Sequence, residues 1–210
     1  TLAPVVITAT RLATDPFELP AAVQGQPIRR DSAGVTLADS LAAVPGLAFR
    51  ERENRAQEAS LAVRGFGSRS TFGIRGVRVL QDEVPATQPD GQGQISQFDL
   101  ATAARVEILR GPFSALYGNS SGGVLQLFSA AGSAPTHARI ALNAGPANER
   151  VVQADVQGAS AADEAGDASG RANATTNGMG DGLATWRFHA GGSDFRTDGL
   201  RGHSAAHRDT

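Results

Sequence analysis

The sequence predicts an α+β domain of short mixed strands, followed by a tail of longer strands that have one apolar and one polar face. Three observations indicate this fold class. One segment, residues 36–44, has the pattern of a helix. Short runs of alternating apolar and polar residues follow it, joined by polar, glycine-rich links, as far as Ala131. Beyond Ala131 the alternating runs are longer, and a low-complexity stretch separates two of them.

The helix is predicted from its ends and its apolar face. Thr36 can cap the first turn, and Pro45-Gly46 ends the segment. The residues at helical spacing that form the apolar face are Leu37, Leu41 and Val44. A further helical turn is expected at residues 112–117.

Four short strands are predicted after the helix, at residues 61–64, 77–80, 106–109 and 124–128. The links at residues 50–58, 66–73 and 86–94 are expected to be loops, because they are polar and rich in glycine.

The tail contains longer alternating runs. Ile140, Leu142 and Ala144 share one face, and the same alternation returns in residues 152–157 and 185–190, with a low-complexity stretch at 159–182 between these two runs. Strands of about ten residues with one apolar face are typical of outer-membrane barrels, although a soluble sandwich has the same pattern. Three such strands cannot close a barrel, because the smallest barrels use about eight. If these are barrel strands, we expect them to be the first of a longer set.

Composition excludes several classes of function. Lys+Arg is 19 against Asp+Glu 21, a net charge of -2, so no concentrated positive charge indicates a nucleic-acid partner. The sequence contains no Cys, which excludes disulfides and thiolate metal sites within it. No stretch approaches the roughly 18 apolar residues of a membrane helix.

Catalytic and metal-binding motifs are weak. Residues 118–122 fit G-x-S-x-G, but a predicted turn of helix precedes them and a strand follows, the reverse of a nucleophile elbow, so a tight turn is expected. His203 and His207 are four residues apart without the Glu of a metalloprotease, and we expect an exposed loop there. The Asp82-Glu83 carboxylates should point to opposite faces of a strand. No enzyme, metal or cofactor is therefore predicted.

Two features remain open at this level. Charged side chains cluster on or beside the short strands, namely Arg64, Arg105, Glu107 and Arg110. They are either structural ion pairs or a network that breaks and reforms when the domain moves. The β-branched run at residues 5–8 is either an ordinary first strand or a free strand that pairs with another protein's sheet edge.

The order of several motifs resembles the plug domain of TonB-dependent outer-membrane receptors. The motifs are Leu-Ala-Ala-Val-Pro-Gly at 41–46, Val-Arg-Gly-Phe at 63–66, residues 105–112, Ser-Ala-Leu-Tyr-Gly at 114–118 and Gly-Gly-Val at 122–124. The resemblance implies a linker with a TonB box at 1–14, a plug at 15–131 and the start of the barrel at 132–210. The residues that look like the TonB box are Val5, Val6, Ile7, Thr8 and Ala9. The resemblance thus favours a free strand that pairs with the periplasmic TonB protein.

The resemblance also implies a function. Such receptors lie in the bacterial outer membrane, in contact with its lipid, and take up a scarce small-molecule or metal-chelate ligand. Residues 64–75 and 85–94 look like one branch of the family, with pyrroloquinoline quinone as a possible cargo and ferric siderophores as the general one. Two departures are Asp82-Glu83, where the family has Asp-Gly, and the long presumed periplasmic turn at 159–182.

By analogy with the family, the ligand would face the three loops at 50–58, 66–73 and 86–94. The side chains nominated for ligand binding are Arg52, Asn54, Arg55, Arg69, Ser70, Phe72, Gln88, Asp90 and Gln92. The arginines could clamp carboxylates and Phe72 could stack on a flat ligand, or the arginines pair with acids of the barrel wall. The alternative function is a soluble periplasmic binding or adaptor domain, which needs an apolar partner for the Ile140/Leu142 face.

Overall fold

The structure is a computed structural model of the chain. It describes residues 22–28, 37–41, 44–50, 59–71, 73–95, 98, 100–111, 113–159, 186–199 and 206–209. The predicted TonB box therefore lies outside the described residues, as do Arg52, Asn54, Arg55 and Phe72.

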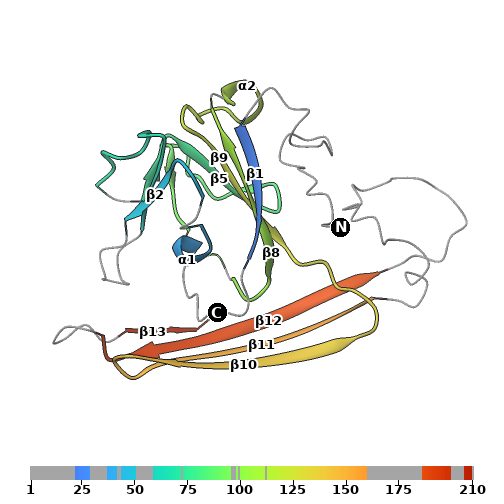
Figure 1. Cartoon of the computed structure of the whole chain (residues 1–210). Helices are drawn as coiled ribbons and strands as arrows, with labels where there is room; N and C mark the ends of the chain where they lie inside the picture. Colours follow the sequence, from blue (N-terminus) through green and yellow to red (C-terminus); the bar gives the residue numbers. More distant parts are fainter. Residues whose placement is uncertain are drawn as a thin grey trace, which may run out of the picture.

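A five-stranded mixed sheet forms the centre of the first domain, in the order β1-β8-β9-β5-β6 (Figure 1). The strands are β1 (Ala22–Pro27), β5 (Val77–Gln81), β6 (Val84–Pro85), β8 (Ala103–Arg110) and β9 (Gly123–Ser129). β5 and β9 are parallel, and the other pairs are antiparallel. The run predicted at 106–109 is thus the middle of a longer strand, because pairing with both β1 and β9 extends it.

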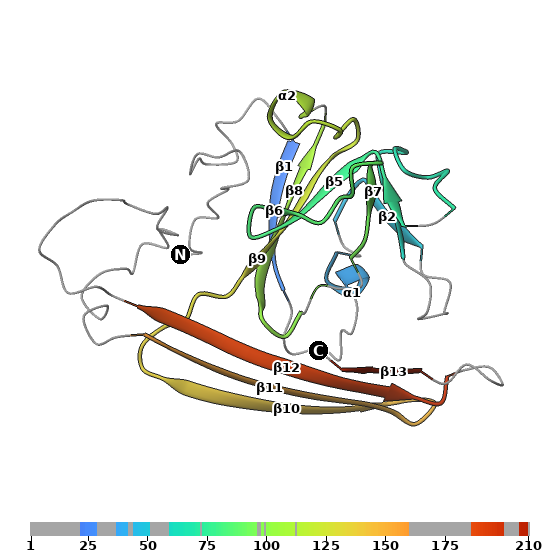
Figure 2. The ribbon, with the colours of Figure 1, turned by 180° about the vertical axis from the view of Figure 1, so that it is seen from behind.

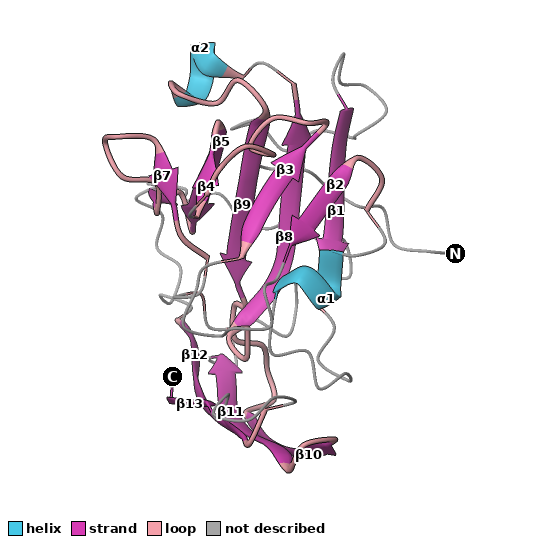
Figure 3. Ribbon diagram, turned by 90° about the vertical axis from the view of Figure 1, so that its left-hand side faces the viewer, coloured by secondary structure: helices cyan, strands magenta, loops and turns pink. Residues whose placement is uncertain are grey.

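The main core lies on one face of this sheet. Helix α1 (Leu37–Leu41) and two small sheets, β2 (Leu47–Arg50) with β3 (Ser60–Val63) and β4 (Ile74–Arg75) with β7 (Gln92–Gly93), cover that face (Figures 1 and 3). Leu37, Leu41 and Val44 are buried in this core, as their spacing predicts.

The opposite face of the sheet holds a smaller apolar cluster and two buried polar side chains. Leu80, Leu109, Tyr117 and Val124 form the cluster, and helix α2 (Ser114–Tyr117) contributes the tyrosine. Glu107 and Gln126 are cross-strand partners on β8 and β9, and both are buried. Because buried polar side chains need hydrogen-bond partners, Glu107 and Gln126 must find theirs on this face of the sheet.

The turn between β5 and β6 corrects one prediction. Asp82 and Glu83 lie in the turn itself, with positive φ angles of 47° and 69°, the geometry of a type I′ hairpin turn (Figure 2). The Asp82 carboxylate accepts hydrogen bonds from Ser129 N at 2.8 Å and Ser129 Oγ at 2.5 Å. This anchoring of Asp82 to the end of β9 helps to hold the turn in a conformation that Gly would adopt with less strain at position 83.

A second sheet follows the first domain, and its four strands form an antiparallel meander, β10 (His137–Gly145), β11 (Glu149–Ala159), β12 (Arg187–Thr197) and β13 (Ala206–Asp209). It lies beneath the first domain in Figure 1. One face is outward and apolar: Ile140 and Leu142 are each 74% exposed, and Val152 and Val156 follow the same parity. The other face is lined by residues such as Gln153 and Asp155. The predicted alternation is confirmed.

This sheet also corrects two predictions. It has four described strands where three were expected, and His207 belongs to β13 rather than to an exposed loop. β13 is only four residues long and polar, so it has no alternating apolar pattern that would predict a strand. It forms because it pairs with β12.

Within the part of the chain that the structure describes, there is no helix long and apolar enough to cross a membrane.

Candidate ligand-binding site

Two of the three predicted ligand loops are joined by backbone pairing. Strand β4 follows the 66–73 loop and β7 lies within the 86–94 loop, and Ile74 pairs with Gly93 while Arg75 pairs with Gln92. Gly67 has a φ of +87°, and a Cβ there would lie 2.6 Å from the carbonyl oxygen of Leu61. The first loop therefore requires glycine at this position, because it packs directly against the β3 backbone.

The second loop is fixed by hydrogen bonds at both ends. Buried Thr87 accepts a hydrogen bond from Val79 N at 2.8 Å through its Oγ1. The Asp90 Oδ1 atom accepts one from Gln92 N at 2.9 Å, which is an Asx turn. Asp90 also forms an exposed ion pair with Arg75, with 3.6 Å between Oδ2 and Nη2. The two loops are thus joined into one surface, which we call the loop face.

The predicted side chains on the loop face differ in their exposure. Arg69, Gln88 and Asp90 are exposed, and Ser70 and Gln92 are half-buried. The Arg69 guanidinium and the Gln88 amide can donate hydrogen bonds to a ligand, and the Asp90 carboxylate, which pairs with Arg75, can accept them. The third loop, at 50–58, lies outside the described residues, so the structure does not place its arginines relative to this face.

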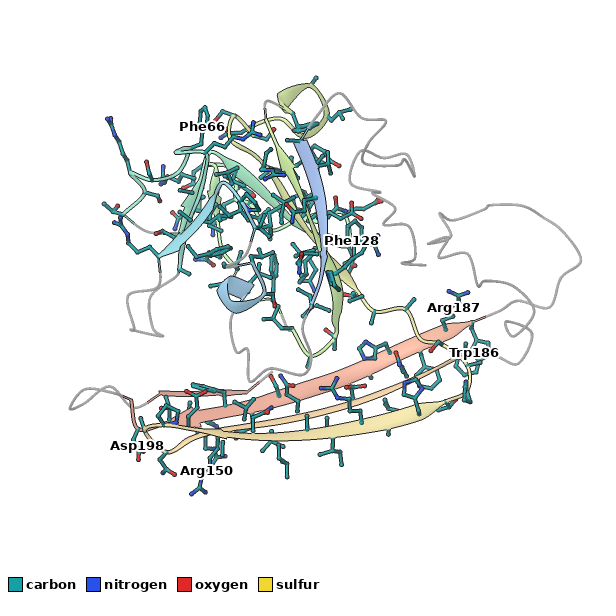
Figure 4. The ribbon with its side chains drawn as sticks, in the orientation of Figure 1. Phe66, Phe128, Arg150, Trp186, Arg187 and Asp198 are labelled. Carbon is teal, nitrogen blue, oxygen red and sulfur yellow. The ribbon has the colours of Figure 1, made fainter. Side chains whose placement is uncertain are left out.

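Phe66 is a candidate that the sequence interpretation missed. Its side chain is 50% exposed at the start of the first loop, and its Cβ packs over Gly122, where a Cβ would come within 2.5 Å (Figure 4). The signal was available, because an aromatic residue between two glycines in Arg-Gly-Phe-Gly has few local neighbours to bury it. Phe66 offers the described loop face an aromatic surface.

The predicted charge cluster divides into two parts on opposite faces of β8. Arg105 Nε donates to Glu107 Oε1 at 3.0 Å, and the Arg105 guanidinium lies 4.0 Å from the centre of the Phe128 ring, which is its register partner on β9. This pair fixes β8 to β9 on the face that carries Gln126.

Arg110 lies on the other face and connects three segments. Its Nη1 donates to the Pro45 carbonyl oxygen at 2.6 Å, just after α1, and its Nη2 is 3.5 Å from Gln24 Oε1 on β1. Burial, followed by repulsion from the nearby Arg64 guanidinium, lowers the pKa of Arg110 below its usual value. Arg64 and Arg110 therefore form a local concentration of positive charge rather than an ion pair with Glu107.

The inward face of the second sheet carries polar side chains toward the first domain. His189 on β12 and Asp155 on β11 are almost fully buried, with 3.8 Å between Nε2 and Oδ2. His137 and Gln157 contact each other through their side chains. Gly191 lies against Thr102, which precedes β8, since a Cβ there would be 3.3 Å from Thr102 Cγ2. The polar face of the sheet is thus turned toward the first domain.

The structure gives no support for enzyme or metal chemistry in the residues that it describes. Residues 118–122 follow α2 and precede β9, which is not the strand–turn–helix order of a nucleophile elbow. No group of three or more His, Asp or Glu side chains among the described residues could hold a metal ion.

Comparison with known proteins agrees with this geometry. The family described as TonB-dependent Receptor Plug Domain matches residues 18–124. The chain is 29% identical over 145 residues to the vitamin B12 transporter BtuB of Vibrio vulnificus (strain CMCP6), covering 67% of this chain and 23% of that protein.

Solved structures show the same fold. The pyoverdine receptor FpvA of Pseudomonas aeruginosa matches 93% of this chain and 25% of its own, with a TM-score of 0.64 and 20% identity. The ferric yersiniabactin uptake receptor FyuA of Yersinia pestis matches 84% of this chain and 24% of its own, with a TM-score of 0.55 and 20% identity. The chain thus spans about a quarter of the length of these relatives. With a family match over half of its residues and a mixed sheet followed by strands that have an outward apolar face, the chain belongs to the plug-domain family of TonB-dependent receptors, which are proteins of the bacterial outer membrane.

Proposed function

We propose that this chain is the plug and the first barrel strands of a receptor that takes up a scarce ligand across the outer membrane with energy from TonB. The domain limits proposed are 1–14 for the TonB box and linker, 15–131 for the plug and 132–210 for the start of the barrel. The cargo proposed is a metal–siderophore complex or a quinone cofactor such as pyrroloquinoline quinone.

One observation carries the proposal: the mixed sheet is followed by a second sheet whose polar face is turned toward it and whose apolar face is exposed. Ile140 and Leu142 keep 74% of their surface exposed, although Ala154 and Val152 are their partners across the strand. An outward band of this kind is stable against lipid and costly against water, at about 25 cal/mol for each Å² of apolar surface. A soluble adaptor domain, the alternative function, would need to cover this band.

The loop face supplies a binding surface. It combines the exposed Arg69 with the Arg75–Asp90 ion pair and with Phe66. A carboxylate-bearing quinone is anionic, as is a ferric chelate whose ligand charges exceed that of Fe³⁺, and both can accept charge-assisted hydrogen bonds from guanidinium groups. The relatives named above are a vitamin B12 transporter, a pyoverdine receptor and a ferric yersiniabactin uptake receptor, so members of the family differ in their cargo.

A receptor in the outer membrane needs an energy source from elsewhere in the cell. The outer membrane holds no nucleotide supply, so work must arrive through a mechanical link, and a peptide that adds a strand to a partner sheet is suited to that link. Ligand binding would shift the plug toward conformers that release residues 5–9 to the periplasm.

The test is ligand binding by the receptor purified in detergent from its own outer membrane. Pyrroloquinoline quinone and a panel of ferric siderophores are titrated separately, with tryptophan fluorescence as the readout. Saturable binding of one of them, weakened by Arg69→Ala and unchanged by Arg187→Gln at the far end of β12, supports the proposal. Absence of the protein from the outer membrane would overturn it.

A further inference from the structure

The turn at residues 118–122, between helix α2 and strand β9, contacts both of the described ligand loops. In the second loop, a Cβ on Gly91 would lie 2.5 Å from Asn119 Nδ2. In the first loop, Phe66 packs against Gly122. We call residues 118–122 the floor turn. Since β9 begins at the next residue, the floor turn connects the loop face directly to the central sheet.

Residue 122 is a glycine because of its neighbour and not because of its own backbone. Its φ lies outside the left-handed region, so its backbone conformation does not require glycine. A Cβ there would lie 2.5 Å from Phe66 Cβ and 3.2 Å from Phe66 Cγ, and 3.0 Å from the carbonyl oxygen of Gly76. Packed atoms do not approach so closely, so any side chain at residue 122 would displace Phe66. Gly122 therefore makes the place that Phe66 occupies.

Phe66 is held in place without being buried (Figure 4). Its backbone exchanges two hydrogen bonds with Val63, from Phe66 N to Val63 O at 3.0 Å and from Val63 N to Phe66 O at 2.9 Å. Val63 is buried in the main core, whereas Phe66 is half exposed and belongs to neither apolar cluster of the plug. An aromatic side chain held in this way contributes little to the core. It is suited to binding, because a group that is already ordered loses little conformational entropy when a ligand arrives.

We propose that Gly122 is a positioning residue for the ligand site. It lets the floor turn hold Phe66 as a preformed aromatic surface for a conjugated part of the ligand, and it acts only through Phe66. The inference rests on the proposed function, because it takes the loop face as the ligand-binding surface. The Phe66 ring would contact the conjugated plane of the ligand, while the exposed Arg69 binds its anionic groups.

The position of Phe66 is tested first without ligand, in the full receptor purified in detergent with 4-fluorophenylalanine at residue 66. Fluorine NMR is expected to give one narrow resonance in the unaltered receptor and a shifted or divided resonance in Gly122→Ala. Gly118→Ala, in the same floor turn, is the matched control. Its φ of +71° strains any side chain, but a Cβ there would have no other atom within 4 Å, so the resonance should stay in place. An equal change in Gly118→Ala, or no change in Gly122→Ala, would overturn the proposal.

The role in binding is tested with two conjugated probes, pyrroloquinoline quinone and a ferric tris-catecholate complex. Gly122→Ala is expected to weaken binding about tenfold, the size of one displaced aromatic contact. Phe66→Gly removes both of the Phe66 atoms that a side chain at residue 122 would meet, so adding Gly122→Ala to Phe66→Gly should cost nothing further. A purely structural effect through the Gly76 carbonyl would instead cost the same tenfold in both backgrounds and would contradict the proposal.

The same pair of variants covers the case in which Gly122→Ala does not fold. Phe66→Gly should then restore its assembly in the outer membrane, and failure of this rescue would overturn the proposal.

The results also separate this inference from the proposed function. If neither conjugated probe binds, or if Phe66→Gly leaves their binding unchanged, the role of Phe66 fails, and uptake of a cargo without conjugated rings, such as a ferric trihydroxamate, would leave the proposed function standing. Absence of the protein from the outer membrane would overturn the proposed function, whereas the fluorine measurement would still decide whether Gly122 holds Phe66.

Discussion

Arg105 and Glu107 form an ion pair in which the acid is fully buried and the base is 29% exposed, with 3.0 Å between Nε and Oε1. The Arg105 guanidinium also stacks over Phe128, so one side chain connects β8 to β9 in two ways. A buried carboxylate needs its charge compensated, and Arg105 supplies that compensation. The pair thereby holds β8 against β9, close to the point where the chain leaves the plug.

Replacing Arg105 by Ala tests whether this pair is structural or part of a switch. Loss of the cation leaves a buried carboxylate, and we expect the free energy of local opening in β8 and β9 to fall by about 3 kcal/mol. Hydrogen exchange of the receptor in detergent measures that opening. Arg105→Lys, which keeps the charge and removes the stacking geometry, should have a smaller effect.

The same experiment separates the two hypotheses for the pair. If the pair is structural, the amides of β8 and β9 are equally protected from hydrogen exchange with and without ligand. A switch would lose protection in β8 when ligand binds, and this loss would disappear in Arg105→Ala.

Replacing Ile140 by Arg tests the lipid-facing assignment. A charge near the middle of the apolar band is expected to cost about 2–4 kcal/mol in barrel stability, whereas Ala144→Arg, on the same face at the border, should cost about 0–1 kcal/mol. Folding into lipid vesicles, followed by heat-modifiability, measures both. Equal and negligible effects of the two changes would indicate that this face lies in water.

Changing Arg69 and Arg55 together to Ala tests the ligand loops. We expect uptake to fall more than the amount of receptor at the cell surface, because both guanidinium groups are proposed to clamp the ligand's carboxylates. Transport assays and surface labelling measure the two quantities. Losses of equal size would show that the arginines serve folding or pair with the barrel wall instead.

Ile7→Pro tests the TonB box. Proline cannot donate to a ladder of backbone hydrogen bonds, so strand addition should fail and transport should be abolished while ligand binding persists. Ile7→Val keeps the donor and the β-branched shape and is expected to transport normally. If Ile7→Pro abolishes ligand binding as well, residue 7 belongs to the plug's core.

The sequence predicts the elements that have strong patterns. The strands at 77–80 and 124–128 and the helix face at Leu37 and Leu41 are present, because alternation and spacing follow directly from burial on one side. β1 could not be found this way, since its residues are nearly all half-buried and show no alternation. β4 and β7 are two residues each and exist because they pair with one another.

The division of the charge cluster was within reach of the sequence. Arg105 and Glu107 are two apart on a strand and must share a face, whereas Arg110 is an odd number of residues from both and points to the other. The partner of Arg110 was not predictable, because the Pro45 carbonyl is 65 residues away in the chain. The place of Phe66 depends likewise on a contact between distant segments, since its Cβ packs over Gly122.

The most direct test of the account is the mass and membrane fraction of the native protein, detected with an antibody to residues 15–131. We predict a heat-modifiable band in the outer membrane at several times 21.6 kDa, the mass of this chain. A soluble band near 21.6 kDa would contradict the account, because it would leave the plug fold without a barrel and the apolar face of β10–β12 without lipid.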